Sequence, residues 1–288
     1  MQGIILKGIG GFYYIETREG IIECKARGIF RKEGLTPLAG DRCDIKLLAN
    51  GKGSIERILP RKNEFVRPPI ANLDKMFVVF AAAQPQPVPA VVDKLTVIAL
   101  QKAVRPYIVI NKTDLTQKSA EEFAKAYQKA GFPVFLVSAR SGEGMDKLRQ
   151  ELNGSTAVFA GCSGVGKSSV LNCLLPDRNL KTGQVSDKIG RGRHTTREVE
   201  LLPSDGGYIA DSPGFSSLET EGITAEELQD YFPEFCGLPA CRFRGCSHVK
   251  EPGCRVKEAV ADGQIAQTRY QSYVELYEKC REIKAWMK

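Results

Sequence analysis

The pattern of apolar and polar residues divides the chain into three stretches of different character. Up to residue 67, short apolar runs such as residues 12–15 and 21–24 stand beside glycine-containing turns. Turns spaced roughly 8–12 residues apart predict a small barrel or sandwich of short strands. The aromatic residues at 12–14 favour a barrel of the oligonucleotide-binding (OB) type, although at least one of these side chains is expected in the barrel core.

After Arg67-Pro68-Pro69, a predicted linker, strand and helix patterns alternate. Helical patterns lie near residues 90–103, 119–131, 144–152 and 167–175, and the proline-rich stretch at 84–89 is predicted to be a loop. Six strands are predicted, at residues 76–82, 107–110, 134–137, 156–160, 199–202 and 208–210. This alternation predicts an α/β domain with a mostly parallel sheet and helices on both faces.

From residue 219 the pattern is helical again. A cluster of Cys, Pro and Gly interrupts it at 236–254, and a last helix is predicted from about Gln264 to Trp286. The chain is therefore predicted to hold three domains: an all-β barrel over 1–67, an α/β domain over 68–218 and a small helical domain over 219–288.

The amino-acid composition limits the class of protein and its location. The 288 residues are 42% hydrophobic and 26% charged, which is ordinary for a soluble globular chain. No apolar run approaches the roughly 20 residues of a membrane span, and the N-terminus lacks a signal-peptide pattern. We therefore expect a cytoplasmic protein with no membrane partner. Nine cysteines in such a protein indicate metal binding or packing rather than disulfides.

The net charge of +7 is unevenly distributed. Residues 1–67 hold 13 Lys and Arg against 8 Asp and Glu, whereas residues 219–288 hold 10 against 12. A basic first segment favours a polyanionic partner, with nucleic acid as the first candidate. A solvated basic surface without a partner is the alternative that charge alone leaves open.

The strongest motif lies past the middle of the chain, between the predicted strand at 156–160 and the helical pattern from 167. It has the form G-x-x-x-x-G-K-S, the pattern of a phosphate-binding P-loop. Backbone N–H groups and the helix N-terminus would surround phosphate oxygens, Lys167 would reach the β- and γ-phosphates, and Ser168 would offer its hydroxyl to Mg²⁺. The predicted phosphate-binding residues are Gly161, Cys162, Ser163, Gly164, Val165, Gly166, Lys167, Ser168 and Ser169.

A base-reading loop is predicted directly after the strand at 107–110, where the sequence is Asn111-Lys112-Thr113-Asp114. The Asp114 carboxylate can accept bonds from the two N–H donors of guanine, a pair that adenine does not offer. Asn111 would tie this loop to the P-loop, and the Lys112 stem would cover the base. Ser138-Ala139 follows the next strand, where the Ala139 N–H could bind the guanine carbonyl while Ser138 braces the loop.

Two segments after the P-loop predict contacts with Mg²⁺ and the γ-phosphate. In D-x-x-G at residues 211–214, Asp211 would hold a water on Mg²⁺ and the Gly214 N–H would reach the γ-phosphate. The segment 190–196 offers Thr195 or Thr196 to the Mg²⁺ shell, with Thr196 marginally preferred. Because apolar Phe215 follows Gly214, where many GTPases place a water-orienting Gln nearby, His194 is the candidate for this catalytic role. Binding of RNA or a partner, or packing, is the alternative for His194.

A candidate zinc site lies in the C-terminal stretch. Three thiols and one imidazole within 14 residues form a closed tetrahedral set, typical of structural rather than catalytic zinc. Metal binding could supply several kcal/mol toward folding a domain with little core of its own. Cys236 is a competing ligand with a less suitable spacing. The predicted ligands are Cys241, Cys246, His248 and Cys254.

The order of these motifs is a circular permutation of the usual GTPase order, in which the P-loop comes first and N-K-x-D comes late. With a basic barrel before it and a Cys₃His set after it, the chain resembles the RsgA/YjeQ family of ribosome small-subunit-dependent GTPases over nearly its full length. The resemblance implies an OB-fold, catalysis by His194, and a GTPase that binds GTP/GDP, the 30S subunit and 16S rRNA. We expect the chain to be a monomer. It also implies action late in 30S maturation with stimulation by the particle. A non-catalytic, GTP-gated RNA-binding module and a zinc-delivering metallochaperone are the rival interpretations, and the closed ligand set argues against the second.

Overall fold

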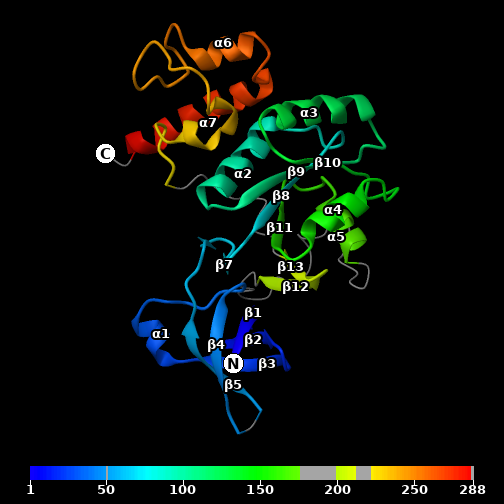
Figure 1. The fold of residues 1–288 in the computed structure, drawn as a ribbon, viewed down its shortest axis with the longest axis vertical. Helices are drawn as coiled ribbons and strands as arrows, with labels where there is room; N and C mark the ends of the chain where they lie inside the picture. Colours follow the sequence, from blue (N-terminus) through cyan, green and yellow to red (C-terminus); the bar gives the residue numbers. More distant parts are fainter. Residues whose placement is uncertain (50, 176–198, 212–221, 287–288) are drawn as a thin grey trace.

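The computed structural model describes residues 1–49, 51–175, 199–211 and 222–286. Three parts follow one another along the long axis of the molecule (Figure 1). A β-barrel stands at one end, a mixed α/β layer structure lies in the middle, and the C-terminal helices lie at the other end. The nucleotide motifs therefore fall between the two terminal parts.

The first part is the predicted all-β barrel, which the structure confirms. Its five strands are β1 (Gln2–Ile9), β2 (Phe12–Thr17), β3 (Gly20–Ala26), β4 (Arg42–Leu47) and β5 (Gly53–Ile58), in the closed order β1-β2-β3-β5-β4. All neighbours are antiparallel except β3 and β5. A short helix, α1 (Gly28–Lys32), lies between β3 and β4. The barrel core is apolar and consists of Ile5, Ile15, Cys24, Phe30, Cys43, Ile45 and Ile55.

The aromatic residues of β2 are half-buried. Tyr13 packs against the barrel core, as expected for at least one of them. The ring of Phe12 instead lies beneath two ammonium groups, 4.8 Å from Lys25 Nζ and 5.7 Å from Lys52 Nζ. Cations over an aromatic face are attracted by its quadrupole, so this edge of the barrel combines positive charge with a flat ring.

The predicted linker is packed rather than extended. Two short strands, β6 (Glu64–Phe65) and β7 (Ile70–Ala71), form a hairpin, and Ile70 also pairs with Ala39 of the barrel segment. At Gly40, φ is +89°, and a Cβ would lie 2.1 Å from the Ala71 carbonyl oxygen. This close approach requires glycine and fixes the barrel to the start of the α/β part.

The middle part holds all six predicted strands in one sheet. The order is β10-β9-β8-β11-β13-β12, and only β12 is antiparallel to its neighbour. Central strand β8 is an almost continuous apolar run, as expected for a strand buried on both faces. The bounds are β8 (Lys75–Ala81), β9 (Arg105–Asn111), β10 (Val134–Leu136), β11 (Thr156–Ala160), β12 (Glu200–Ser204) and β13 (Gly207–Asp211).

Four helices cover the two faces of this sheet. On one face, Val78 and Phe80 of β8 share a core with α2 (Pro89–Gln101) and α3 (Gln117–Lys129). On the other, Phe77 and Val79 share a core with α4 (Met145–Leu152) and α5 (Lys167–Leu174). Asn111 ends β9 and Gly161 follows β11, so the predicted nucleotide loops lie at the carboxyl ends of the parallel strands, where ligands bind in open α/β sheets.

The C-terminal part packs on α2 (Figure 1). Its elements are η2 (Leu228–Tyr231), η3 (Pro233–Phe235), α6 (Arg255–Ala261) and α7 (Gln267–Trp286). Val97 of α2 joins Leu228, Phe232, Tyr273 and Leu276 in one apolar cluster. Within the described ranges, no helix is long and apolar enough to cross a membrane.

Candidate nucleotide site and metal centre

The P-loop runs from the end of β11 to the first turn of α5. Gly161 has φ +147°, and a Cβ there would lie 2.1 Å from the Val79 carbonyl oxygen. Gly166 has φ +93°, and a Cβ there would lie 2.3 Å from Asn111 Nδ2. Both glycines are therefore required for the turn and for its close approach to neighbouring strands. Ser163 and Gly164 at the tip are exposed, whereas Val165 is buried in the core below.

Lys167, Ser168 and Ser169 begin α5, where the N–H groups of the first turn point out of the helix. Lys167 Nζ donates to the carbonyl oxygens of Gly161 at 2.8 Å and Cys162 at 2.7 Å. Burial lowers the pKa of this ammonium group. The Lys167 side chain thus lies across the loop, where a phosphate group would be received.

Asn111 connects the base-reading loop with the P-loop. The side chain, 2% exposed at the end of β9, donates from Nδ2 to the Val165 carbonyl at 3.0 Å. Its Oδ1 accepts from the Ala139 N–H at 3.1 Å. The expected tie between the two loops is present, and it extends to the loop after β10. The Ala139 N–H, expected to meet guanine, is bonded to Asn111 instead.

Asp114 is exposed beside a cavity of about 400 Å³. Ser138, fully buried, donates from Oγ to Asp114 Oδ1 at 2.7 Å, which orients the carboxylate. This is the bracing role expected for Ser138. The cavity is large enough for a heterocyclic base and is lined by Asn111, Lys112, Asp114, Ala139, Arg140 and Gly166.

Lys112 spans from the base-reading loop to the P-loop. Its Nζ donates to the Gly164 carbonyl oxygen at 2.8 Å and to that of Gln84. The Lys112 backbone has φ +62°, while Thr113 has a buried Oγ1 without a partner among the described residues. The stem of Lys112 therefore borders the cavity. Its bond to Gln84 connects the 84–89 loop to the base-reading loop.

The predicted Mg²⁺ and γ-phosphate residues are only partly described. Asp211 ends β13, which runs parallel to β11 with Ala210 opposite Val158. Asp211 therefore lies at the same sheet edge as the start of the P-loop, the position expected for a residue near Mg²⁺. His194, Thr195, Thr196 and Gly214 lie outside the described residues.

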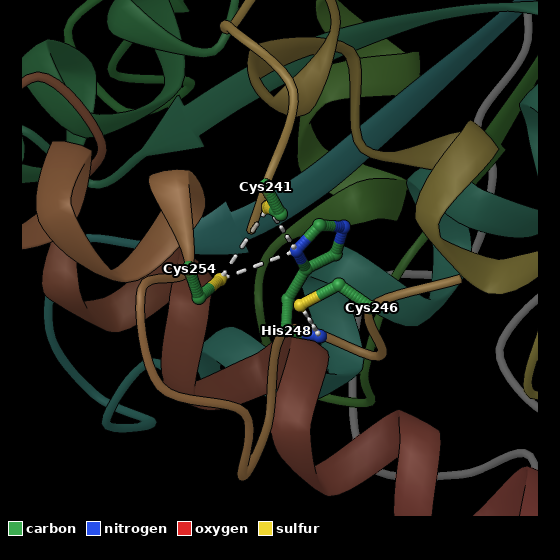
Figure 2. A group of neighbouring side chains, drawn as sticks. All are labelled: Cys241, Cys246, His248 and Cys254. Atoms are coloured by element: carbon green, nitrogen blue, oxygen red, sulfur yellow. Dashed lines mark hydrogen bonds between the residues drawn. The ribbon is translucent and has the colours of Figure 1, made fainter. Parts of the chain in front are cut away.

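The four predicted metal ligands converge in the C-terminal part (Figure 2). The ligand atoms of Cys241, Cys246, His248 and Cys254 all lie within 4.8 Å of one another. The Cys241 and Cys254 sulfurs are 4.0 Å apart, and His248 Nδ1 is 3.3 Å from Cys254 Sγ. Tetrahedral Zn²⁺ with Zn–S bonds of about 2.3 Å requires sulfur atoms about 3.8 Å apart, so the donor set fits this ion.

Surrounding groups orient these ligands. His248 Nε2 is 2.9 Å from Gln229 Oε1, an arrangement in which Nε2 carries the proton and Nδ1 faces the sulfurs. The His248 and Arg255 N–H groups point at the Cys246 and Cys241 sulfurs, at 3.4 and 3.3 Å. Burial raises the pKa of the Cys246 thiol to about 12, so metal binding must displace a proton there. Cys236 is exposed and outside the cluster.

Gln229 and the two α7 tyrosines that hold the metal loop were not predicted from the sequence. Tyr270 and Tyr273 donate to the carbonyl oxygens of His248 at 2.8 Å and Ser247 at 2.7 Å. The sequence places these tyrosines on one helix face and predicts only core packing for them. Their hydroxyl partners are 22 and 26 residues away, so helical periodicity gave no signal for them.

Comparisons with known proteins agree with this geometry. A model of the RsgA GTPase family matches residues 58–221, and one of the RsgA N-terminal domain matches residues 2–55. The chain is 47% identical to the small ribosomal subunit biogenesis GTPase RsgA of Caldanaerobacter subterraneus subsp. tengcongensis, covering 98% of this chain and 96% of that protein. Identity to the protein of the same name from Agathobacter rectalis is 46%, covering 98% of both chains.

Two solved structures share the whole architecture. YjeQ from Thermotoga maritima has a TM-score of 0.85 at 36% identity, covering 97% of this chain and 98% of that one. YloQ, described as a circularly permuted GTPase, has a TM-score of 0.82 at 38% identity, covering 98% and 95%.

The fold and the site together define a circularly permuted P-loop GTPase with a five-stranded barrel before it and a Cys₃His cluster after it. The two family models match residues 2–55 and 58–221, and the two relatives cover 98% of the chain. The chain belongs to the RsgA family of GTPases.

Proposed function

We propose that this GTPase assists late maturation of the small ribosomal subunit, binding the 30S particle and its 16S rRNA and hydrolysing GTP when the particle stimulates it. The proposal rests chiefly on identity near 47% over almost the full length to proteins named small ribosomal subunit biogenesis GTPases. The basic barrel supports an RNA partner, because Lys and Arg neutralise phosphates. The protein acts as a cytoplasmic monomer in this proposal.

The nucleotide is held at two places in the proposed complex. Asp114 accepts the N–H groups of guanine, Lys112 and Ala139 border the base, and Asn111 and Thr113 shape the loop. The phosphates lie over residues 161–169, where glycine N–H groups and Lys167 face them. Ser168 and one of Thr195 and Thr196 would hold Mg²⁺, with Asp211 nearby, and the Gly214 N–H would contact the γ-phosphate. Bound Mg²⁺ would neutralise charge on the phosphate oxygens.

His194 is the proposed catalytic residue. Phe215 directly follows Gly214, so no glutamine stands there to orient the attacking water. An imidazole can position a water molecule by accepting its hydrogen bond, which is what the in-line displacement at the γ-phosphate requires. The resemblance to the family supports the same assignment.

The Cys₃His cluster is proposed as a structural zinc site with one ion per chain. Four protein ligands leave no open position for a substrate or water, and structural sites are closed in this way. The ion would fix the loop from Cys241 to Cys254 against α7 and so allow a small helical part to fold.

Initial rates of GTP hydrolysis with and without purified small subunits test the proposal. We expect the particle to raise the rate for the wild-type chain and His194→Ala to remove most of that rise without weakening GTP binding. If turnover is the same with and without particles and His194→Ala changes nothing, the non-catalytic, GTP-gated RNA-binding module becomes the better account.

A further inference from the structure

The first strand of the barrel packs against the last hairpin of the GTPase sheet (Figure 1). Leu6 of β1 is 6% exposed and belongs to the same apolar core as Val199 and Leu201, at the start of the edge strand β12. The barrel has an apolar core of its own, which does not include Leu6. A leucine of one part in the core of another indicates a fixed junction between the barrel and β12.

A β-bulge turns Leu6 out of the barrel. Ile5 lies opposite Ile15 and Lys7 lies opposite Tyr14, so Leu6 is an extra residue without a counterpart on β2. An extra residue of this kind bends its strand and redirects its side chain. Ile5 remains in the barrel core, whereas Leu6 enters the core of the GTPase sheet. The bulge therefore creates the apolar contact between the two parts.

The residue after the bulge forms an ion pair across the same junction. Lys7 Nζ donates to Glu200 Oε1 at 3.0 Å, and both side chains are half-buried. The Lys7 ammonium group also lies 5.6 Å from the centre of the Tyr14 ring, which attracts it from the barrel side. A second polar contact links Tyr208 of β13 with Glu16 of β2. The barrel thus contacts both strands of the β12–β13 hairpin.

This hairpin connects the two segments that carry the predicted Mg²⁺ and γ-phosphate residues. β12 begins at Glu200, shortly after Thr196 in the sequence, and β13 ends at Asp211. Glu200 lies directly opposite Asp211 in the antiparallel register. Residues paired in this way have Cα atoms about 4.5–5.5 Å apart, so a displacement of β12 is passed to Asp211. The ion pair of the barrel is therefore formed by the direct neighbour of Asp211.

We propose that Leu6 and Lys7 are positioning residues for GTP hydrolysis. When the barrel binds the small subunit, they fix the β12–β13 hairpin and thereby the place of Asp211 at the nucleotide. Coupling of this kind needs a contiguous set of contacts, which the junction provides, and misplacement of a catalytic group by about 1 Å can cost 10²-fold in rate. The inference rests on the proposed stimulation by the particle and on the proposed role of Asp211, and it adds the route between them.

The test compares kcat for GTP hydrolysis at saturating concentrations of purified small subunits. Lys7→Glu places two carboxylates at the junction, Glu200→Lys places two ammonium groups there, and the double variant Lys7→Glu/Glu200→Lys restores opposite charges. We expect each single variant to lower this kcat about 3- to 30-fold without changing KM for GTP. The double variant should recover most of the loss, because the two changes act on one contact.

Arg27→Glu is the matched control. It makes the same change of charge in another exposed ion pair of the barrel part, in which Arg27 lies 2.9 Å from Glu56. Both Arg27→Glu and Lys7→Glu make the barrel less basic and so weaken binding to RNA, which is why rates are compared at saturation. We expect wild-type kcat with particles for Arg27→Glu, because its pair has no partner in the β12–β13 hairpin.

Amide hydrogen exchange tests the same junction without particles. Because coupling acts in both directions, replacing GDP by a non-hydrolysable GTP analogue with Mg²⁺ should change exchange in β12 and also in β1. In Lys7→Glu the change in β1 should shrink, while that in β12 remains.

Three results would overturn the proposal. The first is wild-type kcat of Lys7→Glu with saturating particles. The second is a double variant as slow as the single variants, because Lys7 would then act on the particle directly. The third is identical exchange of β1 with the two nucleotides. If particles do not stimulate the wild-type chain, the proposed function fails instead, and hydrogen exchange still decides whether the barrel and the hairpin are coupled.

Discussion

At the scale of single residues, Asn111 connects three loops because its carboxamide carries both a donor and an acceptor. The donor is bonded to Val165 of the P-loop and the acceptor to Ala139 of the loop after β10. The bond to Val165 is buried and the bond to Ala139 is partly buried, so loss of the first leaves a buried polar group unsatisfied. Asn111 thus positions the base-reading residues relative to the phosphate-binding loop.

Asn111→Asp should keep the acceptor for the Ala139 N–H and place a carboxylate oxygen against the Val165 carbonyl. We expect a loss of about 1–3 kcal/mol in the free energy of unfolding, together with weaker GTP binding. Denaturant titration and nucleotide binding measure the two effects. Asn153→Asp, at an exposed position after α4, is the matched control. Unchanged GTP affinity in Asn111→Asp would contradict the bridging role.

Asp114→Asn should change the preferred base. The carboxylate accepts two donors from guanine, whereas an amide can pair with xanthine, which has a carbonyl in place of the exocyclic amine. We expect GTP affinity to fall by about 10²- to 10⁴-fold and xanthosine triphosphate (XTP) to bind better than GTP. Competition between the two nucleotides for the variant measures this shift. If ATP competed equally with GTP for the wild-type chain, the assignment of Asp114 would fail.

The types and spacings of these residues were predictable from sequence, since a P-loop and an N-K-x-D loop each depend on local order. The partner of the Ala139 N–H was not, because Asn111 lies 28 residues earlier in the chain. The contact of Lys112 with Gln84 was missed for the same reason, at a separation of 28 residues.

At the scale of secondary-structure elements, all six strands of the sheet follow from apolar runs in the sequence. The run is buried on both faces in the central strand β8, whereas the edge strand β10 is partly exposed. The hairpin β6–β7 did not follow, because its two-residue strands carry no periodicity and one of them is stabilised by pairing with Ala39. The short helix α1 was missed as well. Its five residues are too few to show a helical period.

The metal loop has few elements of its own and depends on its ligands. Removal of zinc by a chelator should unfold the loop, at a cost of several kcal/mol in the stability of the C-terminal part. Gln229→Ala removes the acceptor at His248 Nε2 and should weaken zinc binding by about 10- to 100-fold, measured by chelator competition. Gln271→Ala, exposed on α7, is the control and should bind zinc normally. Equal zinc affinity in both variants would exclude the positioning role of Gln229.

At the scale of the whole molecule, one arginine of the C-terminal part forms an ion pair with helix α2 of the GTPase part. Arg269 of α7 is 1% exposed and donates to Asp93 of α2 at 2.6 Å and to Glu234 of η3 at 2.6 and 3.0 Å. Burial by itself would lower the pKa of Arg269, but the two carboxylates raise it above its usual value. The guanidinium also lies 4.6 Å from the centre of the Phe232 ring.

Arg269→Ala should therefore be strongly destabilising. It leaves two buried carboxylates without their cation, and removal of one partner from such a group costs about 3–5 kcal/mol. Denaturation should become biphasic, with the C-terminal part unfolding before the sheet. Arg281→Ala, which removes an exposed pair with Glu278, should change stability by less than about 1 kcal/mol. A single transition with wild-type stability in Arg269→Ala would show that the apolar cluster around Val97 is sufficient.

We propose that this chain hydrolyses a nucleotide recognised by Asp114 when it binds the small ribosomal subunit. The decisive measurement is hydrolysis of XTP by Asp114→Asn, with and without purified small subunits, because contaminating GTPases on the particles do not use XTP efficiently. We predict that the particles raise XTP hydrolysis by the variant and that His194→Ala in the same background removes the increase. XTP binding without any increase in hydrolysis on adding subunits would contradict this activity.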